Sequence, residues 1–430
     1  MARSSYDVVV VGARVAGAPT AMLLARKGYR VLLVDRMRFP SDTMSSHFIP
    51  AYGTARLARW GLLRRLLDTG CPPISRLTSD WGDIRLTGTP PPYESTRIGV
   101  CPRRYIIDKL LIDAATESGA EFEENFLVTG LLGEQDRVRG VRGRTKAGAQ
   151  VAVPARFVVG ADGMRSFVAR SVRAQEYDTV EPLTITYYTY FENLPMDELL
   201  IHWRPGRCVP AIPTHHGHTV VLCGSPYDQW QRFRADVEGN YFRAIEQQVP
   251  EFAERLRDAH RVERFTGTRD VPNFFRKPSG PGWALVGDAG YHKDPVTALG
   301  MADSFRDSEY LAEALDAALS GRRREQDALA DYEKRRNADA GPLYRYTIEQ
   351  ARYRPLDRLT SLVLRALEDN EDDRDYFFGV LAGSVRPDEF SSLRNVIRIL
   401  TKAGLLSELG RLSDRQELAA VDADHVAGQP

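Results

Sequence analysis

The stretch that decides the fold is residues 6–36, YDVVVVGARVAGAPTAMLLARKGYRVLLVDR. It opens with Val8–Val11, an unbroken β-branched run that is typical of a strand buried on both faces. A helical segment rich in Ala, Met and Leu follows, and Gly28 stands where a helix is expected to stop. A second apolar run, Val31–Val34, ends at Asp35. The pattern therefore predicts a β-α-β unit at the start of the chain.

The turn inside this unit carries an incomplete glycine fingerprint. Gly12 and Gly17 frame it, but Arg14 replaces the middle glycine of the pattern G-x-G-x-x-G. Backbone amides at a helix N-terminus suit a pyrophosphate, and a carboxylate after the second strand suits ribose hydroxyls. We therefore expect dinucleotide binding, with the Arg14 guanidinium able to pair with phosphate. An ordinary β-α-β unit with a glycine-rich turn is the alternative.

Composition narrows the class of protein. The chain has 430 residues, enough for two or three domains, and 43% of them are hydrophobic. The formal net charge is zero, so nothing favours a nucleic-acid or membrane partner. The four cysteines are scattered without a C-x-x-C motif, and no apolar run approaches 18 residues. We expect a cytoplasmic protein with no signal peptide, no disulfide framework and no metal site.

The order of segments predicts an α/β fold: a Rossmann-type nucleotide-binding domain with an inserted, mainly antiparallel β-sheet substrate domain and a helical C-terminal region. Residues 53–68 are expected to form one helix, and residues 126–159 a meander of strands. The predicted division is 1–80, 100–175 and 276–340 for the nucleotide-binding domain, 81–99 for an excursion to the substrate domain, 176–275 for the substrate domain, 341–420 for C-terminal helices and 421–430 for a disordered tail.

Two further motifs follow the fingerprint in order. The first is Asp162-Gly163-x-x-Ser166-x-x-x-Arg170, and the second is Gly287-Asp288-Ala289 followed by Pro295 and Gly300. Over roughly residues 5–340, the three motifs together resemble the single-component flavoprotein aromatic monooxygenases of the p-hydroxybenzoate hydroxylase fold. Flavin-dependent halogenases and geranylgeranyl reductases share that fold. Turn and capping chemistry is the alternative explanation for Asp162, Gly163 and Asp288.

The resemblance implies an FAD site. Asp288 would accept hydrogen bonds from the ribityl hydroxyls, the amides of Leu299 and Gly300 would face the flavin N1–C2=O edge, and Pro295 would lie near the reactive C4a–N5 edge. The sequence departs from the family at Arg14, at Asp35, where glutamate is more usual, and at Ala302, where asparagine is frequent. The residues expected to bind FAD are Gly12, Arg14, Ala16, Gly17, Asp35, Arg36, Arg104, Asp162, Gly163, Gly287, Asp288, Pro295, Leu299, Gly300 and Met301.

The resemblance also implies the chemistry. We expect an FAD-dependent oxidoreductase that takes electrons from NADPH or NADH and inserts one oxygen atom from O₂, through a flavin C4a-hydroperoxide, into an aromatic or polyketide-like small molecule. A flavin-dependent reductase or dehydrogenase, a halogenase and a non-enzymatic prenyl-protein chaperone remain alternatives. Halogenases need a lysine after the first helices and a W-x-W-x-I-P motif; this chain has no lysine between Lys27 and Lys109 and lacks that motif. A monomer or a homodimer is expected.

Candidate substrate and catalytic residues lie outside the cofactor motifs. Alternation along residues 183–191 places Tyr188 and Tyr190 on one face of a strand, and Tyr187 and Phe191 on the other; we expect one pair to reach the substrate. His47 is predicted to face the flavin ring. His292, with Pro295, is expected near the reactive edge, where His292 or Lys293 could manage a proton or lie in an exposed loop. The turn with His215, His216 and His218 is a poor metal site. The C-terminal helices are expected to pack on the FAD-binding domain, with closure of the pocket or a dimer contact as the alternatives.

Overall fold

The computed structural model describes residues 5–134 and 136–409. Its centre is a parallel sheet built around β1 (Tyr6–Val11), which lies between β10 (Gln150–Gly160) and β2 (Val31–Val34). The edges are β20 (Trp283–Leu285), with β19 (Ser279–Gly280) beyond it, and β7 (Glu121–Glu123). The predicted β-α-β unit is confirmed, with α1 (Gly17–Arg26) between β1 and β2.

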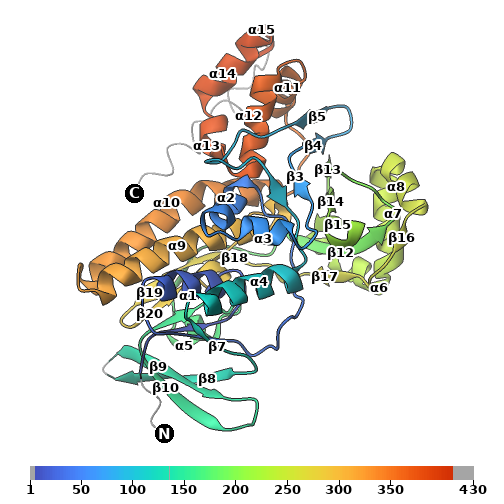
Figure 1. The fold of residues 1–430 in the computed structure, drawn as a ribbon. Coiled ribbons are helices and arrows are strands. Elements are labelled where there is room, and N and C mark those ends of the chain that lie inside the picture. Colours follow the sequence, from blue (N-terminus) through green and yellow to red (C-terminus); the bar gives the residue numbers. More distant parts are fainter. Residues whose placement is uncertain (1–4, 135, 410–430) are drawn as a thin grey trace.

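Because side chains alternate along β1, the strand contributes to two apolar cores, one on each face of the sheet. Val8 and Val10 pack under helices on one face, and Val9 and Val11 pack against a β-meander on the other. The helices are α1, α4 (Arg104–Glu117), α9 (Gly300–Leu319) and α10 (Glu325–Ala351). The meander, at the bottom of Figure 1, is β8 (Leu127–Glu134), β9 (Arg137–Arg144) and the first half of β10. α5 (Phe167–Ser171) follows β10.

A second sheet has the order β16-β12-β15-β14-β13-β4-β5, with β17 also paired to β12. Helices α6 (Trp230–Ala235), α7 (Val237–Gln248) and α8 (Pro250–Arg257) cover one face through a shared apolar core. The strands are β12 (Thr184–Glu192), β13 (Leu199–Arg204), β14 (Arg207–Pro213), β15 (Thr219–Pro226), β16 (His260–Arg261), β17 (Thr266–Thr268), β4 (Leu77–Asp80) and β5 (Arg85–Gly88). The early β4–β5 hairpin joins this sheet because β4 pairs in parallel with β13.

Short elements connect the two sheets. A three-stranded sheet contains β11 (Glu176–Val180), β18 (Asn273–Arg276) and β21 (Tyr291–His292), and a two-stranded one contains β3 (Pro73–Ile74) and β6 (Gly99–Val100). Single 3₁₀ turns are η1 (His215–Gly217), η2 (Tyr227–Gln229), η3 (Gly287–Ala289) and η4 (Pro295–Thr297). The last two lie between β20 and α9, so they belong to the third sequence motif.

The C-terminal helices, at the top of Figure 1, pack on β4 and β5 and on the face of the second sheet opposite α6–α8. They are α11 (Arg358–Ala366), α12 (Glu371–Ala382), α13 (Pro387–Phe390), α14 (Leu393–Lys402) and α15 (Leu406–Leu409). Within residues 5–134 and 136–409, no helix is both long and apolar enough to cross a membrane. The predicted tail, 421–430, lies outside the described residues.

The predicted fold class is confirmed, but one predicted helix is divided in two and another helix crosses a predicted domain boundary. Residues 53–68 form two helices, α2 (Ala51–Arg59) and α3 (Leu63–Leu67), because Gly61 adopts φ +80° and ends the first. In addition, α10 continues to Ala351 through Pro342, so it crosses the predicted domain boundary between residues 340 and 341. Tyr344 and Ile348, buried beyond the proline, supply the packing that offsets the lost backbone hydrogen bond.

Candidate functional site

A cavity of about 1000 Å³ lies at the carboxyl ends of the parallel strands. All three sequence motifs reach it, through residues such as Gly12, Asp162 and Asp288. The second sheet forms its far wall, and residues after β2, among them Met44 and Ser45, form another side. One hollow therefore runs from the fingerprint turn to the predicted substrate domain.

The fingerprint turn is as tight as its glycines allow. Gly12 has φ +102°, and a Cβ there would lie 2.4 Å from the Ala161 carbonyl oxygen. A Cβ on Gly17 would lie 1.8 Å from the Gly12 carbonyl oxygen. No side chain caps α1, whose N-cap is Ala16; the Ala18 amide bonds the Arg14 carbonyl and Pro19 has no N–H, so the Gly17 amide is the one left for a ligand in this first turn. Gly17 itself is buried behind the cavity wall, whereas Gly12 and Ala16 line it.

Asp35 ends β2 beside this turn and lines the cavity. Its Oδ2 accepts a hydrogen bond of 2.8 Å from the Ala13 amide, and its Oδ1 accepts one of 2.8 Å from the Met37 amide. The carboxylate therefore holds the turn in shape and keeps one further lone pair on each oxygen for a ligand hydroxyl. Arg36, next in the chain, also lines the cavity and is exposed.

Arg14 does not reach into the cavity as a free cation. Its guanidinium contacts the buried Asp108 carboxylate at 2.5 Å and bonds the Ser41 carbonyl and hydroxyl at 3.2 and 3.0 Å. Arg104 holds the other oxygen of Asp108 at 3.1 Å. Two arginines on the cavity wall thus share one buried carboxylate behind it. The sequence pointed to both arginines, but Asp108 was missed because nothing local marks it.

The second motif is a capped turn that faces the cavity. Asp162 accepts hydrogen bonds from the Ser166 hydroxyl at 2.5 Å and the Phe167 amide at 2.6 Å, so it satisfies the first amide of α5 and orients Ser166, which is the N-cap. Burial raises the pKa of its carboxyl. Asp162 and Gly163 both line the cavity, and a Cβ on Gly163 would meet no atom within 4 Å. The capping explanation therefore accounts for Asp162, while the open space at Gly163 suits the close approach of a ligand.

The third motif presents an unused acceptor and an uncapped helix. Asp288 lines the cavity, and within the described part of the chain no hydrogen bond or ion pair holds its carboxylate. Gly300 begins α9, which no side chain caps, and a Cβ there would also meet no atom within 4 Å. Met301 lines the cavity as well, but the side chain of Leu299 is buried away from it. The unused acceptor at Asp288, two uncapped helix starts and the arginines beside the fingerprint turn fit FAD.

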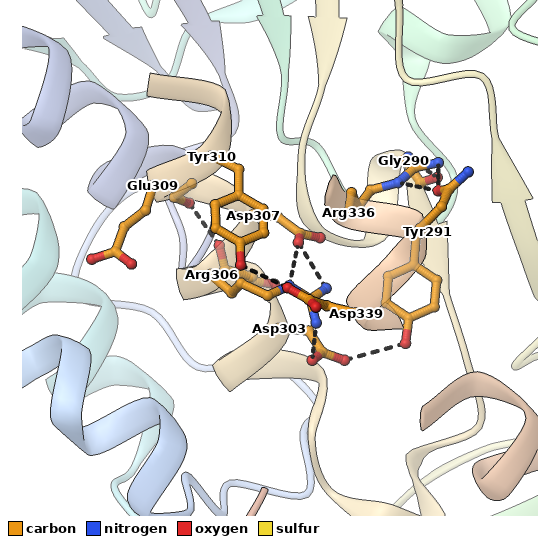
Figure 2. A network of polar contacts seen from close by, with 12 residues as sticks. Gly290, Tyr291, Asp303, Arg306, Asp307, Glu309, Tyr310, Arg336 and Asp339 are labelled. Atoms are coloured by element: carbon orange, nitrogen blue, oxygen red, sulfur yellow. Dashed lines mark hydrogen bonds and ion pairs between the residues drawn. The ribbon is translucent and has the colours of Figure 1, made fainter. Parts of the chain in front are cut away.

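A buried charge network lies beneath the start of α9 (Figure 2). Arg306 contacts Asp303 at 3.2 Å and Asp307 at 2.7 Å, and the Tyr291 hydroxyl donates to Asp303 at 3.2 Å. Lys293 also forms an ion pair with Asp303. Burial alone would raise the pKa of Asp303, but the two cations lower it, so this carboxylate stays ionised. Sequence reasoning missed this network, although charged residues inside an otherwise apolar helix start are its one visible signal.

The part of the cavity wall that the second sheet forms is uncharged. Strands β12–β15 present alternate side chains to the cavity, and none of them is charged. They are Thr186, Tyr188, Leu199, Ile201, Trp203, Cys208, Pro210, Ile212, Leu222 and Gly224. The alternation predicted for β12 is confirmed: Tyr188 and Tyr190 face this side, and Tyr187 stacks on Phe233 in the opposite core.

His47 and Tyr190 differ from expectation, because they lie behind the cavity wall. His47 is fully buried with φ +61°, and its Nε2 lies 2.7 Å from the Tyr190 hydroxyl. The Arg103 guanidinium covers the Tyr190 ring at 3.9 Å. Burial, with Arg104 and Arg103 nearby, lowers the pKa of His47 to about 3, so the imidazole is neutral. Tyr188 lines the cavity and shields both residues.

The loop before α9 places the remaining predicted residues. Pro295 opens η4 and lines the cavity. His292 lies in β21 with its ring stacked on Phe274, and its Nδ1 is bonded to the Pro272 carbonyl. It also lines the cavity and is buried, so the alternative of an exposed loop does not apply to it. Among residues 5–134 and 136–409, no three His, Cys, Asp or Glu side chains are grouped to hold a metal ion.

Comparison with known proteins agrees with this geometry. Digeranylgeranylglycerophospholipid reductase of Methanosarcina acetivorans is 26% identical over 417 residues, 93% of each chain. The structure of the myxobacterial chondrochloren halogenase aligns with TM-score 0.75 and 23% identity, covering 93% of this chain and 97% of that one. PqsL, a probable FAD-dependent monooxygenase from Pseudomonas aeruginosa, aligns with TM-score 0.67 and 20% identity, covering 88% and 99%.

These likenesses show the fold, and a family model shows the cofactor. The model described as FAD binding domain matches residues 5–346, a span that contains all three motifs and every strand of the parallel sheet. The protein is therefore an FAD-dependent flavoprotein of the fold shared by flavin halogenases, monooxygenases and geranylgeranyl reductases. By this match over most of its length, the chain belongs to the FAD-binding domain family.

Proposed function

We propose that the protein is an FAD-dependent monooxygenase that oxygenates an aromatic or polyketide-like small molecule, with NADPH or NADH as electron donor. The observation that carries this proposal is the division of the cavity into a charged end and an uncharged end. Bound FAD supplies redox chemistry and reaction with O₂. The chain's own residues bind the cofactor, exclude water and orient the substrate.

The uncharged end supports the choice of substrate class. Ile201, Trp203 and Leu222 offer flat or aliphatic surface, and the Tyr188 ring stands at the edge of the wall. Burying an uncharged ring system against such a wall is favourable, at about 25 cal/mol for each Å² removed from water. A charged substrate would lose hydration there without gaining an ion pair from β12–β15. An aromatic or polyketide-like compound fits these demands.

A flavin-dependent reductase is the second candidate. It is supported by the archaeal relative named above, a digeranylgeranylglycerophospholipid reductase, which matches 93% of the chain. The same uncharged wall would suit an isoprenoid chain. A halogenase has less support, although neighbours of that kind share the fold, because the segment between Lys27 and Lys109 contains no lysine and the W-x-W-x-I-P motif is absent.

Mass spectrometry of product separates these candidates. Purified protein with FAD and NADPH is incubated with a panel of aromatic and polyprenyl compounds, with and without O₂. A monooxygenase gives a product heavier by one oxygen atom only when O₂ is present. A product gaining hydrogen without O₂ supports the reductase, and a halide-dependent halogenated product supports the halogenase. Asp288→Ala, which removes the unused carboxylate facing the cavity, should lose FAD and activity together, whereas Arg64→Ala on the surface should lose neither.

A further inference from the structure

Asp294 stands where the charged and uncharged ends of the cavity meet. It follows β21 and precedes η4, it lines the cavity, and only 1% of its surface is exposed to solvent. Its neighbours come from both halves of the molecule. Thr184 belongs to β12 of the second sheet, and Asn273 belongs to β18 of the connecting sheet. A group at this place can contact a ligand that extends from either end.

The carboxylate is held by neutral donors alone. The Thr184 hydroxyl donates to Oδ2 at 2.6 Å and the Val296 amide donates to Oδ1 at 3.0 Å, while the Asp294 amide donates to Asn273 Oδ1 at 2.7 Å. Within the described residues, no Lys, Arg or His nitrogen lies within 4.0 Å of its carboxylate oxygens. The adjacent Lys293 is turned away to Asp303.

The other groups that face Asp294 carry no charge. Cys208 approaches from β14, and Tyr353 approaches from the segment after α10; burial raises the pKa of both, so the thiol and the phenol stay protonated. On its own segment, His292 is bonded to the Pro272 carbonyl. With no cation to favour ionisation, burial raises the pKa of Asp294 to about 6, against the two hydrogen bonds that lower it.

Two other cavity acids, Asp303 and Asp307, lack this combination, and Asp162, which neutral donors also hold, is only partly buried. Asp303 is ion-paired with Lys293 and Arg306, and Asp307 is paired with Arg306. Asp294 caps the three-residue η4, but an asparagine would make the same cap without the cost of a buried carboxylate. Its chemistry as an acid therefore needs an explanation beyond capping.

We propose that Asp294 is the residue that exchanges a proton with the ligands bound where the two ends of the cavity meet. As a carboxylate it accepts the proton of a substrate hydroxyl: the substrate O–H bond breaks, a carboxyl O–H bond forms, and no electrons are transferred to the protein. The carboxyl then returns that proton to the oxidised product or to water. This role rests on the proposed function, because it requires a bound hydroxylated substrate beside FAD.

The test uses the FAD-loaded enzyme and its Asp294→Asn variant, which keeps the size and the capping oxygen. Infrared spectra from about pH 4 to pH 8 report the carbonyl band of a protonated carboxyl, and visible spectra report the flavin. We expect wild type to lose the carboxyl band and to shift the flavin absorption with one shared midpoint near pH 6. Both changes should be absent in Asp294→Asn and retained in Asp373→Asn, whose aspartate pairs with Arg398 in the C-terminal helices.

Three results would overturn the role of Asp294. One is that no carboxyl titrates near pH 6. Another is a carboxyl band that disappears without any flavin response, which would make Asp294 a buried cap out of reach of ligands. The third is a flavin shift unchanged in Asp294→Asn. A protein that binds no FAD overturns the proposed function itself, so the two failures are distinguishable.

Discussion

At the scale of single residues, Arg14 shows how a departure from a motif can acquire a structural purpose. Arg14 stands where the fingerprint has its middle glycine. Its side chain joins three segments: the turn itself, residues 41–42, and the start of α4 through Asp108. The positive charge that we expected to meet phosphate is instead shared with Asp108. We propose that Arg14 aids FAD binding chiefly by holding the loop after β2 against the cavity.

Replacing Arg14 by glycine should therefore weaken FAD binding, even though it restores the usual motif. The loop at residues 41–42 loses its hydrogen bonds, and Asp108 keeps only Arg104 as a partner. We expect the FAD dissociation constant to rise about tenfold, equivalent to about 1.4 kcal/mol. Fluorescence titration of FAD into apoprotein measures it, with the surface variant Arg64→Ala as a control. An unchanged constant would show that the clamp is irrelevant to the cofactor.

Asp294 also makes a prediction about stability. Its folded-state pKa of about 6 lies above the ordinary value of 3.8, so the folded protein binds a proton that the unfolded chain releases between these values. Stability from this group is fully present below about pH 4 and falls as pH rises to about 6. Above that pH, ionisation costs about 3 kcal/mol. Relative to wild type, the free energy of unfolding of Asp294→Asn should rise by about this amount between pH 4 and pH 7, as measured by denaturant unfolding. The same pH dependence of stability in both proteins would contradict this prediction.

Individual residues that line the cavity were the most predictable part of the candidate site, and their neighbours the least. Gly12, Asp35 and Asp288 could be named because each stands at the end of a recognisable strand. Asp108 and Asp303 could not, because their partners come from distant elements and only the fold brings the charges together. His47 was placed on the wrong side of the wall, since a sequence does not show which way a loop side chain turns.

At the scale of elements, periodicity predicted strands and helices well, and their ends poorly. The alternation in β12 correctly separated Tyr188 from Tyr187. By contrast, Gly61 ended a helix that apolar spacing alone would continue, and α10 runs through Pro342 and across a predicted domain boundary. In both places a local signal of about 1 to 3 kcal/mol competes with tertiary packing that a sequence window does not contain.

Helix α14 offers a direct measure of such packing. Leu400 is fully buried in the core shared with the second sheet, whereas Leu393 at the start of the same helix is 43% exposed. We expect Leu400→Ala to lower the free energy of unfolding by about 2–5 kcal/mol and Leu393→Ala to change it by less than about 0.5 kcal/mol. Equal effects in thermal unfolding would mean that α14 does not pack as described.

At the scale of the whole molecule, the chain passes three times through the nucleotide-binding layer and encloses one cavity between two sheets. Each pass adds one piece: the tight turn and Asp35, then Asp162 and Gly163, then Asp288 and the start of α9. The order of these pieces was readable in the sequence. The division of the cavity into a charged end and an uncharged end was not, because it depends on which face of β12–β15 meets the parallel sheet.

The central claim is that this single cavity holds FAD and presents it to a substrate on the uncharged wall. The most direct measurement is the visible spectrum and FAD content of the purified protein, before and after addition of a compound that it oxygenates. We predict one FAD for each chain and a shift of the flavin absorption when the compound binds. A protein that stays colourless and cannot be reconstituted with FAD, or a flavin spectrum indifferent to the compound, would contradict it.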